Sequence, residues 1–376
     1  MPLYYPAAAA LAAVLLSRLG QRSPVRGEKT QRVLVVAMRR LGDVLLTTPL
    51  IRSVKRAFPQ AAIDALVFAG TEGILAGNPD LAGILTIRQR PRAGETLALA
   101  AKIAKRYDLA LSTQTGDRPT FLACIAGRQS AGPLQAEGFS AAVKRLTLSR
   151  SYVSDPSRHR VLENLRLAEV IGIPAYAEIV CPAGAARPAL APPQAYAVVH
   201  AAPMFIYKRW TIGGWRMLVA ALRERGLATV VTGAAADRAY LDEVFRDSDV
   251  VRLDGKLAWP ELSALIGAAR AYIGPDTAIT HLAAASGCPT VALYGPTDPR
   301  LWGPWPLGGL DQPWTAAGTI QRRGNVWLVQ NPLPCLPCQL EGCERRLDSH
   351  SQCLDELSVT QVAAAVDQAL AMRQAA

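Results

Sequence analysis

The stretch AYIGPDTAITHLAAASGCPTVALYGPTDP, Ala271–Pro299, contains two apolar runs separated by a segment of helical length. The runs AYIG and TVALYG have the length and composition of buried strands, and each ends in Gly-Pro. The segment between them predicts a helix that begins at Asp276 or Thr277. A strand, a helix and a strand in this order predict a βαβ unit on a parallel sheet.

Polar side chains gather where these strands are expected to end. A helix start offers free N–H groups to an anion, and Thr277 and His281 are four residues apart, on one face of that helix. Asp276 would repel a phosphate, so it suits the hydroxyls of a sugar. Thr297 lies in the neighbouring loop. The alternative is a Pro-Asp-Thr helix cap with a core histidine, and the stretch alone leaves both open.

The same alternation of strands and helices occurs twice in the chain. RVLVVAM (Arg32–Met38), IDALVFA and YDLALST predict the first parallel sheet, and YAVVHA, ATVVTG, AYIG and TVALYG predict the second. AGAARPALAPPQ (Ala183–Gln194) has three prolines and no periodicity, which indicates a linker. We therefore predict an α/β fold of two Rossmann-like domains whose strands end at a central cleft.

These patterns give five segments. We expect an apolar and basic arm (1–30), an acceptor domain (31–185), a linker (186–194), a donor domain (195–330), and a tail with cysteines and a C-terminal helix (331–376). YYPAAAALAAVLL in the arm is too short for an ordinary transmembrane helix. Either the arm lies on an anionic membrane surface or it has no membrane role.

Composition limits the partners. Half of the 376 residues are apolar, and the formal net charge is +11. A large apolar core excludes a disordered chain, and the positive charge favours anionic partners. Nucleic acid is the least favoured of these because no platform of interleaved aromatic and basic residues is present. The chain contains neither GxGxxG nor GxxxxGK[ST] nor GxSxG, which disfavours nicotinamide, P-loop and serine-hydrolase chemistry.

Two further segments carry reactive groups. In HAAPMFIYKRW, Lys208 follows a strand and could neutralise a leaving diphosphate, although a lone lysine is more often solvated. In MRRLGDVLLTTP, Gly42 allows close backbone approach, and Asp43 is expected to cap a helix that continues to Phe58. A carboxylate there can act as a general base if a hydroxyl reaches it. Arg39 and Arg40 add positive charge beside it.

The seven cysteines fall into two groups. Three are scattered in apolar surroundings, which indicates reduced thiols and a cytoplasmic location. The other four follow the spacing C-x2-C-x4-C-x9-C and are Cys335, Cys338, Cys343 and Cys353. They predict either a structural zinc site or four free thiols, and metal analysis separates the two.

Together, the segments RVLVVAMRRLGDVLLTTPLIRSVKRAFPQAAIDALV, YKRW and GPDTAITHLAAASGCPTVALYGPTDPRLWGPW resemble glycosyltransferase family 9, the heptosyltransferases of the lipopolysaccharide inner core. The resemblance covers roughly Arg32 to Trp305. It implies a fold of the GT-B type and an inverting transfer, without a required metal or other cofactor. The implied donor is a nucleotide sugar, usually ADP-heptose, and the implied acceptor is an anionic glycolipid at the inner membrane.

The resemblance also implies roles for residues that match its motifs. Asp43 corresponds to the catalytic base and Lys208 to the diphosphate ligand. Asp276, Thr277 and His281 correspond to the donor-binding set. We add three further strand-end residues to that set: Gly233, Gly295 and Thr297.

Some features of the site are not carried over from the family. Ala278 stands where many family members have glycine, which leaves the sugar open. We assign Arg39, Arg40, Gln114 and Arg118 to the acceptor. Two alternatives remain, a nucleotide-sugar epimerase on the same fold and a non-catalytic nucleotide-sugar or membrane-binding module.

Overall fold

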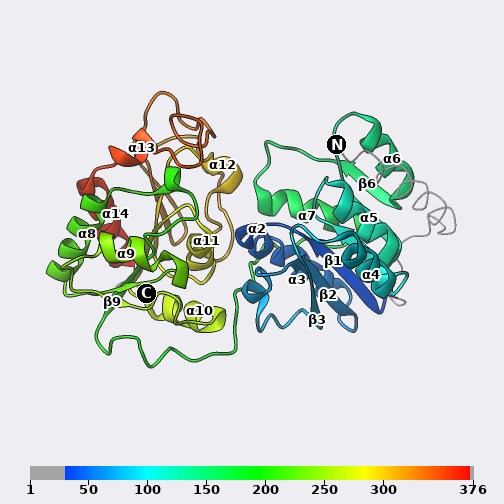
Figure 1. Cartoon of the computed structure of the whole chain (residues 1–376), viewed down its shortest axis with the longest axis horizontal. Helices are drawn as coiled ribbons and strands as arrows, with labels where there is room; N and C mark the ends of the chain where they lie inside the picture. The colour runs from blue at the N-terminus through cyan, green and yellow to red at the C-terminus, as the bar shows by residue number, and fades with distance from the viewer. Residues whose placement is uncertain (1–29, 373–376) are drawn as a thin grey trace. The chain divides into compact units, whose positions relative to one another are not determined.

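The computed structural model describes residues 30–372. The chain divides into two compact units between Val180 and Cys181 (Figure 1). Each unit is an α/β structure built on its own sheet. The expected N-terminal arm lies almost entirely outside the described residues. Within the segment expected to be a linker, 183–194, the structure has no helix or strand.

The first unit contains a six-stranded sheet in the order β3-β2-β1-β4-β5-β6, and every neighbouring pair is parallel. Its strands are β1 (Arg32–Ala37), β2 (Ala62–Phe68), β3 (Gly83–Ile87), β4 (Tyr107–Ser112), β5 (Gly127–Leu134) and β6 (Arg150–Val153). Its helices are α2 (Leu41–Leu45), α3 (Thr48–Ala57), the 3-10 turn η2 (Glu72–Leu75), α4 (Ala93–Ile103), α5 (Asp117–Ala126), α6 (Phe139–Thr147) and α7 (Arg160–Ile171).

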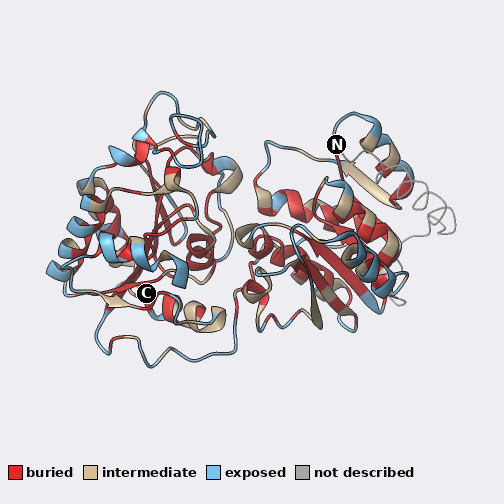
Figure 2. Cartoon of the chain, viewed as in Figure 1, coloured by how far each residue is buried: buried red, intermediate tan, exposed pale blue. Residues whose placement is uncertain are grey.

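Helices cover both faces of this sheet. Val33 and Val35 of β1 belong to a buried cluster with residues of α3 and α7. Leu34 and Val36 belong to a second cluster with residues of α4 and α5. Successive side chains of a strand point to opposite faces, so an apolar run such as RVLVVA can fill two cores at once (Figure 2).

The second unit contains a seven-stranded sheet in the order β12-β13-β11-β10-β7-β8-β9. Its strands are β7 (Tyr196–Val199), β8 (Ala228–Val231), β9 (Val251–Arg252), β10 (Ala271–Pro275), β11 (Thr290–Leu293), β12 (Ile320–Arg323) and β13 (Val326–Val329). Its main helices are α8 (Ile212–Glu224), α9 (Arg238–Val244), α10 (Trp259–Ala268), α11 (Ala278–Ala285), α12 (Pro299–Trp302), α13 (Gln352–Asp355) and α14 (Val359–Met372), with 3-10 turns η3 (Ile206–Lys208) and η4 (Ala235–Asp237). Only β12 pairs antiparallel among these described strands.

The two units share one topology. If the antiparallel edge strand β12 is set aside, the second sheet reads β9-β8-β7-β10-β11-β13, which is the order 3-2-1-4-5-6 of the first sheet. In both units the first strand therefore lies beside the fourth, and the connections leave these two strands toward opposite edges of the sheet. Ligands of doubly wound sheets bind beyond the carboxyl ends of strands at such a point.

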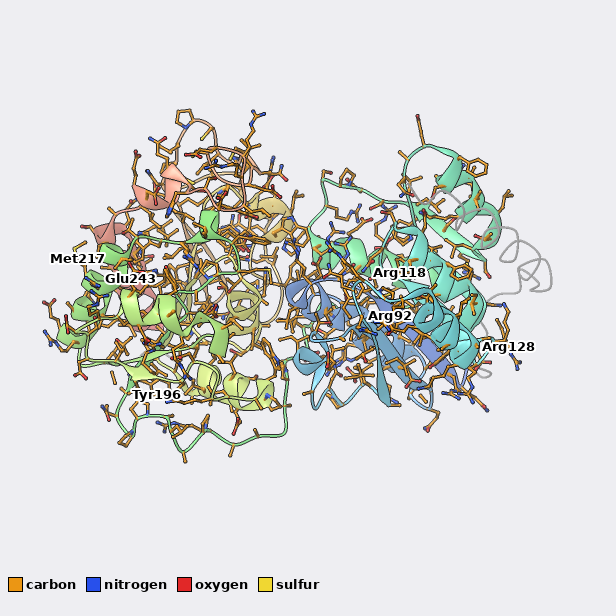
Figure 3. All side chains as sticks on the ribbon, viewed as in Figure 1. Arg92, Arg118, Arg128, Tyr196, Met217 and Glu243 are labelled. Carbon is orange, nitrogen blue, oxygen red and sulfur yellow. The ribbon has the colours of Figure 1, made fainter. Side chains whose placement is uncertain are left out.

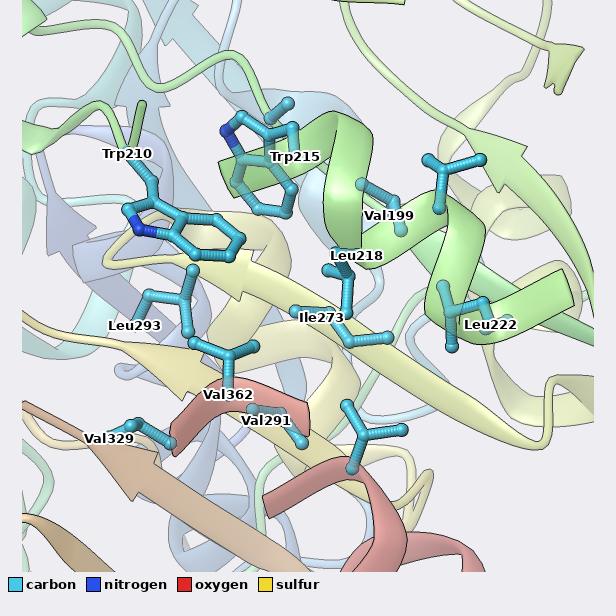
Figure 4. Packing of buried hydrophobic residues seen from close by; sticks show 14 of the residues in the cluster. Val199, Trp210, Trp215, Leu218, Leu222, Ile273, Val291, Leu293, Val329 and Val362 are labelled. Atoms are coloured by element: carbon cyan, nitrogen blue, oxygen red, sulfur yellow. The ribbon is translucent and has the colours of Figure 1, made fainter. Parts of the chain in front are cut away.

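The C-terminal segment belongs to the second unit. Val362, Val366 and Ala369 of α14 are buried in the same cluster as Ile273 and Val291 of the sheet (Figure 4). Trp210 and Trp215 also belong to this cluster. Their ring centroids lie 5.1 Å apart, and the ring planes meet at 78°. The indole N–H of Trp210 donates to the carbonyl of Leu357 at 2.9 Å, so it ties the start of α8 to the start of α14.

The strands expected from the sequence are confirmed to within two residues at each end. Three features were not expected: β3, the pair β5 and β6, and the hairpin of β12 and β13. The expected C-terminal helix is confirmed as α14. No helix in the described part of the chain is long and apolar enough to cross a bilayer.

Two adjacent glycines in the first turn of α8 give a matched test of the core. A Cβ at Gly214 would lie 2.5 Å from Cε2 of Trp210, whereas a Cβ at Gly213 would have no neighbour within 4 Å. We expect Gly214→Ala to lower the free energy of unfolding by about 1–3 kcal/mol through overpacking. Gly213→Ala should leave it unchanged or raise it by up to about 1 kcal/mol. Equilibrium urea unfolding measures both, and equal effects would contradict this packing.

Candidate functional site

The loop after β1 carries the carboxylate of Asp43. The structure corrects the expected cap: Arg40 is the N-cap residue, and Asp43 lies inside the first turn of α2. Arg39 donates from Nη1 to Oδ1 of Asp43 at 3.0 Å. The carboxylate is thus held by a guanidinium from the preceding turn, at the carboxyl end of β1.

The single helix expected from Asp43 to Phe58 is also wrong, because the chain forms α2 and α3 with a break between them. Pro49 has no N–H for the carbonyl of Leu45, so one helix could not continue through it. The hydroxyl of Thr48 donates to that carbonyl at 2.8 Å instead. Asn164 of α7 donates to the carbonyl of Leu46 at 2.9 Å and fixes the break from outside.

A second guanidinium near Asp43 was missed in the sequence. Arg160 begins α7 and is partly buried. Burial lowers the pKa of Arg160, the positive charge of Arg39 lowers it further, and Asp43 partly offsets both. Arg160 lies 117 positions after Asp43 in the sequence, and no local motif marks it. Asp43 is therefore one acidic group beside two cationic ones.

Of the two residues assigned to the acceptor that lie outside the loop after β1, Gln114 is the nearer to that strand. It follows β4, the strand beside β1, and Thr113 donates to the carbonyl of Val36 in β1 at 3.1 Å. Gln114 is buried, and its amide nitrogen has no hydrogen-bond partner in the described part of the chain. A buried donor without a partner is costly, and a polar group of a bound ligand could satisfy this nitrogen.

Arg118 points elsewhere. It donates from Nη2 to the carbonyl of Gln89 at 3.1 Å, and its guanidinium lies 5.4 Å from the ring centroid of Phe68 (Figure 3). Burial lowers its pKa. Arg118 thus lies toward the ends of β2 and β3, beyond the position of Gln114.

In the second unit, three predicted residues from three strand ends meet. Lys208 ends η3 after β7, Asp276 follows β10, and Thr297 follows β11. Lys208 forms an ion pair with Asp276 through Nζ and Oδ2. The hydroxyl of Thr297 donates to the same Oδ2 at 2.7 Å. Because β7 and β10 are neighbours, residues 68 positions apart form one cluster at the switch point.

The carboxylate of Asp276 is buried and charged. Burial would raise its pKa, but the positive charge of Lys208, the nearby His281 and the hydrogen bonds from Lys208 and Thr297 together hold the pKa below its ordinary value. Nε2 of His281 lies 4.0 Å from Oδ1 of Asp276. A lysine ammonium has three N–H donors, so Lys208 can bind a further anion while it keeps Asp276.

Thr277 and His281 occupy the first turns of α11. The hydroxyl of Thr277 accepts the amide N–H of Thr280 and caps the helix. His281 is buried one turn later, as the spacing predicted. The sequence left open whether this stretch is a helix cap or a ligand site, and the two interpretations are compatible. Thr277 caps the helix, and Asp276 before it is paired with Lys208.

The two strand-end glycines are explained by packing. A Cβ at Gly295 would lie 2.8 Å from Leu354, and one at Gly233 would lie 2.7 Å from Leu241. Gly42 is an ordinary residue of α2. Sequence reasoning missed His200, which follows β7, contacts Thr232 at 3.2 Å and is buried. Burial lowers the pKa of His200 to about 4, against a smaller opposing effect of Asp237, so it is neutral at pH 7.

For the four C-terminal cysteines, the choice between a structural zinc site and four free thiols stays a prediction. Among residues 30–372, no three His, Cys, Asp or Glu side chains are gathered as metal ligands. Cys353 is turned into the core beside Gly295, whereas Cys335 and Cys343 are exposed. Burial first, and then the neighbouring Cys338, Cys343 and Cys335, raise the pKa of Cys353 to about 12.

Comparison with known proteins identifies the family. The family model described as glycosyltransferase family 9 (heptosyltransferase) matches residues 96–308. Lipopolysaccharide heptosyltransferase 3 of Escherichia coli K12 is 31% identical over 290 residues, which cover 71% of this chain and 83% of that protein. The chain belongs to glycosyltransferase family 9. It is a glycosyltransferase, which decides between the transferase and the two alternatives that the sequence left open.

Solved structures share the fold. The structure of E. coli ADP-heptose lipopolysaccharide heptosyltransferase II has a TM-score of 0.70 at 19% identity, and the match covers 92% of this chain and all of that one. E. coli heptosyltransferase WaaC, solved with ADP, has a TM-score of 0.64 at 20% identity with the same coverage. The predicted GT-B class, with two α/β units on parallel sheets, is thereby confirmed.

The ion pair of Lys208 and Asp276 can be tested without any substrate. We expect Lys208→Met to lower the free energy of unfolding at pH 7 by about 1–3 kcal/mol, because it leaves a buried carboxylate unpaired. Without the cation, burial raises the pKa of Asp276, so the loss should shrink between pH 7 and pH 5 as the carboxyl takes up a proton. In the wild type, the ion pair should keep its contribution to stability between pH 7 and pH 5, because the pKa of Asp276 in the folded protein lies below the ordinary value.

The double variant Lys208→Met/Asp276→Asn is the control. It removes both charges, so it should recover part of the stability and lose the pH dependence. Urea unfolding at pH 5, 6 and 7 measures the cycle. If the single variant loses the same free energy at every pH, Asp276 is not the group left unpaired.

Proposed function

We propose that this chain transfers a heptose, with inversion, from an ADP-sugar to the lipopolysaccharide core or a related anionic glycolipid. The cluster of Lys208, Asp276 and Thr297 carries the proposal, because it sets a cation at the strand ends where a nucleotide sugar binds in doubly wound sheets. Relatives named as lipopolysaccharide heptosyltransferases, and a similar structure solved with ADP, support the donor and the acceptor.

In the second unit, the proposed role of Lys208 is to stabilise the leaving diphosphate. Asp276 and Thr297 hold the ammonium in one place before the donor arrives, so little reorganisation is needed as negative charge builds. The start of α11 offers backbone N–H groups near the same residues. Thr277, His281, Gly233 and Gly295 complete the proposed donor-binding set. The neutral His200, buried beside this edge, adds no competing charge.

In the first unit, the proposed role of Asp43 is that of general base. Its carboxylate removes the proton from the acceptor hydroxyl, and the oxygen attacks the anomeric carbon opposite the diphosphate. Arg39 orients the carboxylate, and Arg40, Gln114 and Arg118 are assigned to the acceptor. We add Arg160 to this group because its guanidinium interacts with the charge of Asp43. Cationic groups around the base suit an acceptor that carries negative charge.

The proposal includes no metal and no cofactor, because Lys208 and the helix start supply the positive charge that a metal would otherwise provide. It places the reaction in the cytoplasm, where nucleotide sugars are made, on the inner face of the membrane that holds the acceptor. The proposed attachment to that membrane is peripheral.

The donor is tested by thermal shift of the purified chain against ADP-, UDP- and GDP-sugars. A ligand at 100 times its dissociation constant adds about 2.7 kcal/mol, which corresponds to a shift of several degrees for a domain of this size. We expect such a shift with ADP-heptose and none with UDP- or GDP-sugars. Lys208→Ala should lose most of it. A response to UDP-sugars alone would contradict the assigned donor.

The general base is tested by Asp43→Asn. This change keeps the size of the side chain and removes its basicity, so kcat should fall by about 10²–10⁴. The thermal shift with the donor should stay as in the wild type, since the second unit holds it. Asp155→Asn, a half-exposed carboxylate of the same unit, is the matched control and should keep full activity. Near-normal turnover of Asp43→Asn would remove Asp43 from the mechanism.

A further inference from the structure

Helix α6 of the first unit presents its apolar side chains outward. Its buried residues are Ala141, Lys144 and Thr147. Phe139 and Leu146 have exposed fractions of 85% and 72%, and Phe139 is the most exposed large apolar residue within residues 30–372. Ala142 is also exposed, and Val143 is half-buried. A surface helix of a water-facing protein normally shows the opposite pattern.

The four outward residues form one stripe. Phe139, Ala142, Val143 and Leu146 have the spacing i, i+3, i+4 and i+7, which puts them on a single helix face. Single exposed apolar residues are common and need no explanation, but a continuous stripe over the length of a helix does. We call these four residues the α6 stripe.

The orientation of α6 is fixed from below by a buried cation. Nζ of Lys144 donates to the carbonyl of Thr115 and to Oε1 of Gln135, the latter at 3.1 Å, and forms an ion pair with Asp117 at 2.7 Å. Its side chain is only 6% exposed. Rolling the helix to bury Phe139 would expose these contacts and break them. The outward stripe is therefore imposed by the fold.

Charge separates the two units of the chain. Residues 1–180 contain 24 Lys and Arg against 13 Asp and Glu, whereas residues 181–376 contain 17 of each. The whole net charge of +11 thus belongs to the unit that carries α6. Arg145 borders the stripe in the last turn of the helix and is exposed. An apolar face beside the exposed Arg145, on a domain of net positive charge, matches the surface of a bilayer that contains anionic lipid.

We propose that the α6 stripe docks the first unit on an anionic membrane, with Phe139 and Leu146 inserted among the lipid chains and Arg145 at the phosphates. A second copy of the chain fits this face less well. Four side chains of one nine-residue helix offer far less than the roughly 800 Å² per partner of a stable dimer, and two such units repel each other. Shallow insertion into a bilayer needs only a short face of this kind.

The docking would also position the acceptor loop. Lys144 links α6 to Thr115, which directly follows Gln114. The loop that we assign to the acceptor is therefore held by the helix that we assign to the lipid surface. This link to the acceptor rests on the proposed function, whereas membrane docking itself does not.

Vesicle co-sedimentation of the full chain tests the proposal. The probes are vesicles of phosphatidylcholine with phosphatidylglycerol and, for comparison, of phosphatidylcholine alone. We expect the wild type to bind the anionic vesicles, and Phe139→Ser/Leu146→Ser to bind them at least about tenfold more weakly. Met217→Ser, which changes an exposed apolar residue of α8, should bind as the wild type does (Figure 3).

Charge is tested by a second matched pair. Arg145→Glu should weaken binding about tenfold or more, whereas Arg246→Glu, an exposed arginine of the second unit with the same change in net charge, should have a much smaller effect. All variants should keep the wild-type unfolding midpoint and the thermal shift with the donor. Failure of the donor assay and failure of vesicle binding are thereby separate results.

Three outcomes would overturn the proposal. The first is wild-type vesicle binding by Phe139→Ser/Leu146→Ser. The second is a wild-type dimer in light scattering that this variant abolishes, which would make the stripe an interface between copies. The third is a lower unfolding midpoint of the variant, which would show that the stripe is packed against another part of the chain.

Discussion

The adjacency of the first and fourth strands is the constraint on which both halves of this protein depend. Parallel pairing puts the carboxyl ends of β7 and β10 side by side, and the connections that follow them run in opposite directions along the sheet. Lys208 and Asp276 therefore meet although 68 positions separate them. The same adjacency of β1 and β4 brings the segment of Asp43 and that of Gln114 to one edge of the first sheet. The same topology therefore occurs in both units, but different side chains lie at the carboxyl ends of the central strands.

The strands around these edges could be predicted because their residues are buried on both faces. In the run RVLVVA, all five residues after Arg32 are apolar and buried, which is typical of a strand covered by helices on both faces. By contrast, β5 has the sequence GRQSAGPL, with glycine, proline, arginine and serine, and no propensity marks it as a strand. It forms because β4 and β6 pair with it on both sides. Tertiary pairing overrides local preference there.

The candidate site shows the same limit. Sequence reasoning placed Lys208, Asp276 and Thr297 at strand ends, because Gly, Pro and Asp mark where strands stop. It could not show that one carboxylate oxygen receives both Lys208 and Thr297, since that depends on the register of three strands. Arg160 was missed for a related reason: it approaches Asp43 from a helix far along the chain. The break before α3 could have been read from Pro49, which prevents a continuous helix.

The distribution of charge gives the two units different means of attracting anions. The first unit carries the entire net charge, so it exerts a long-range field that weakens with salt. The second unit has as many acidic as basic residues, so a field of the whole unit cannot draw a diphosphate to it. In the proposed function the attraction comes instead from a local group, and Lys208 suits that role because Asp276 keeps it at the strand ends. On that proposal, the buried carboxylate of Asp276 serves anion binding by fixing where the positive charge lies, although it lowers the net positive charge.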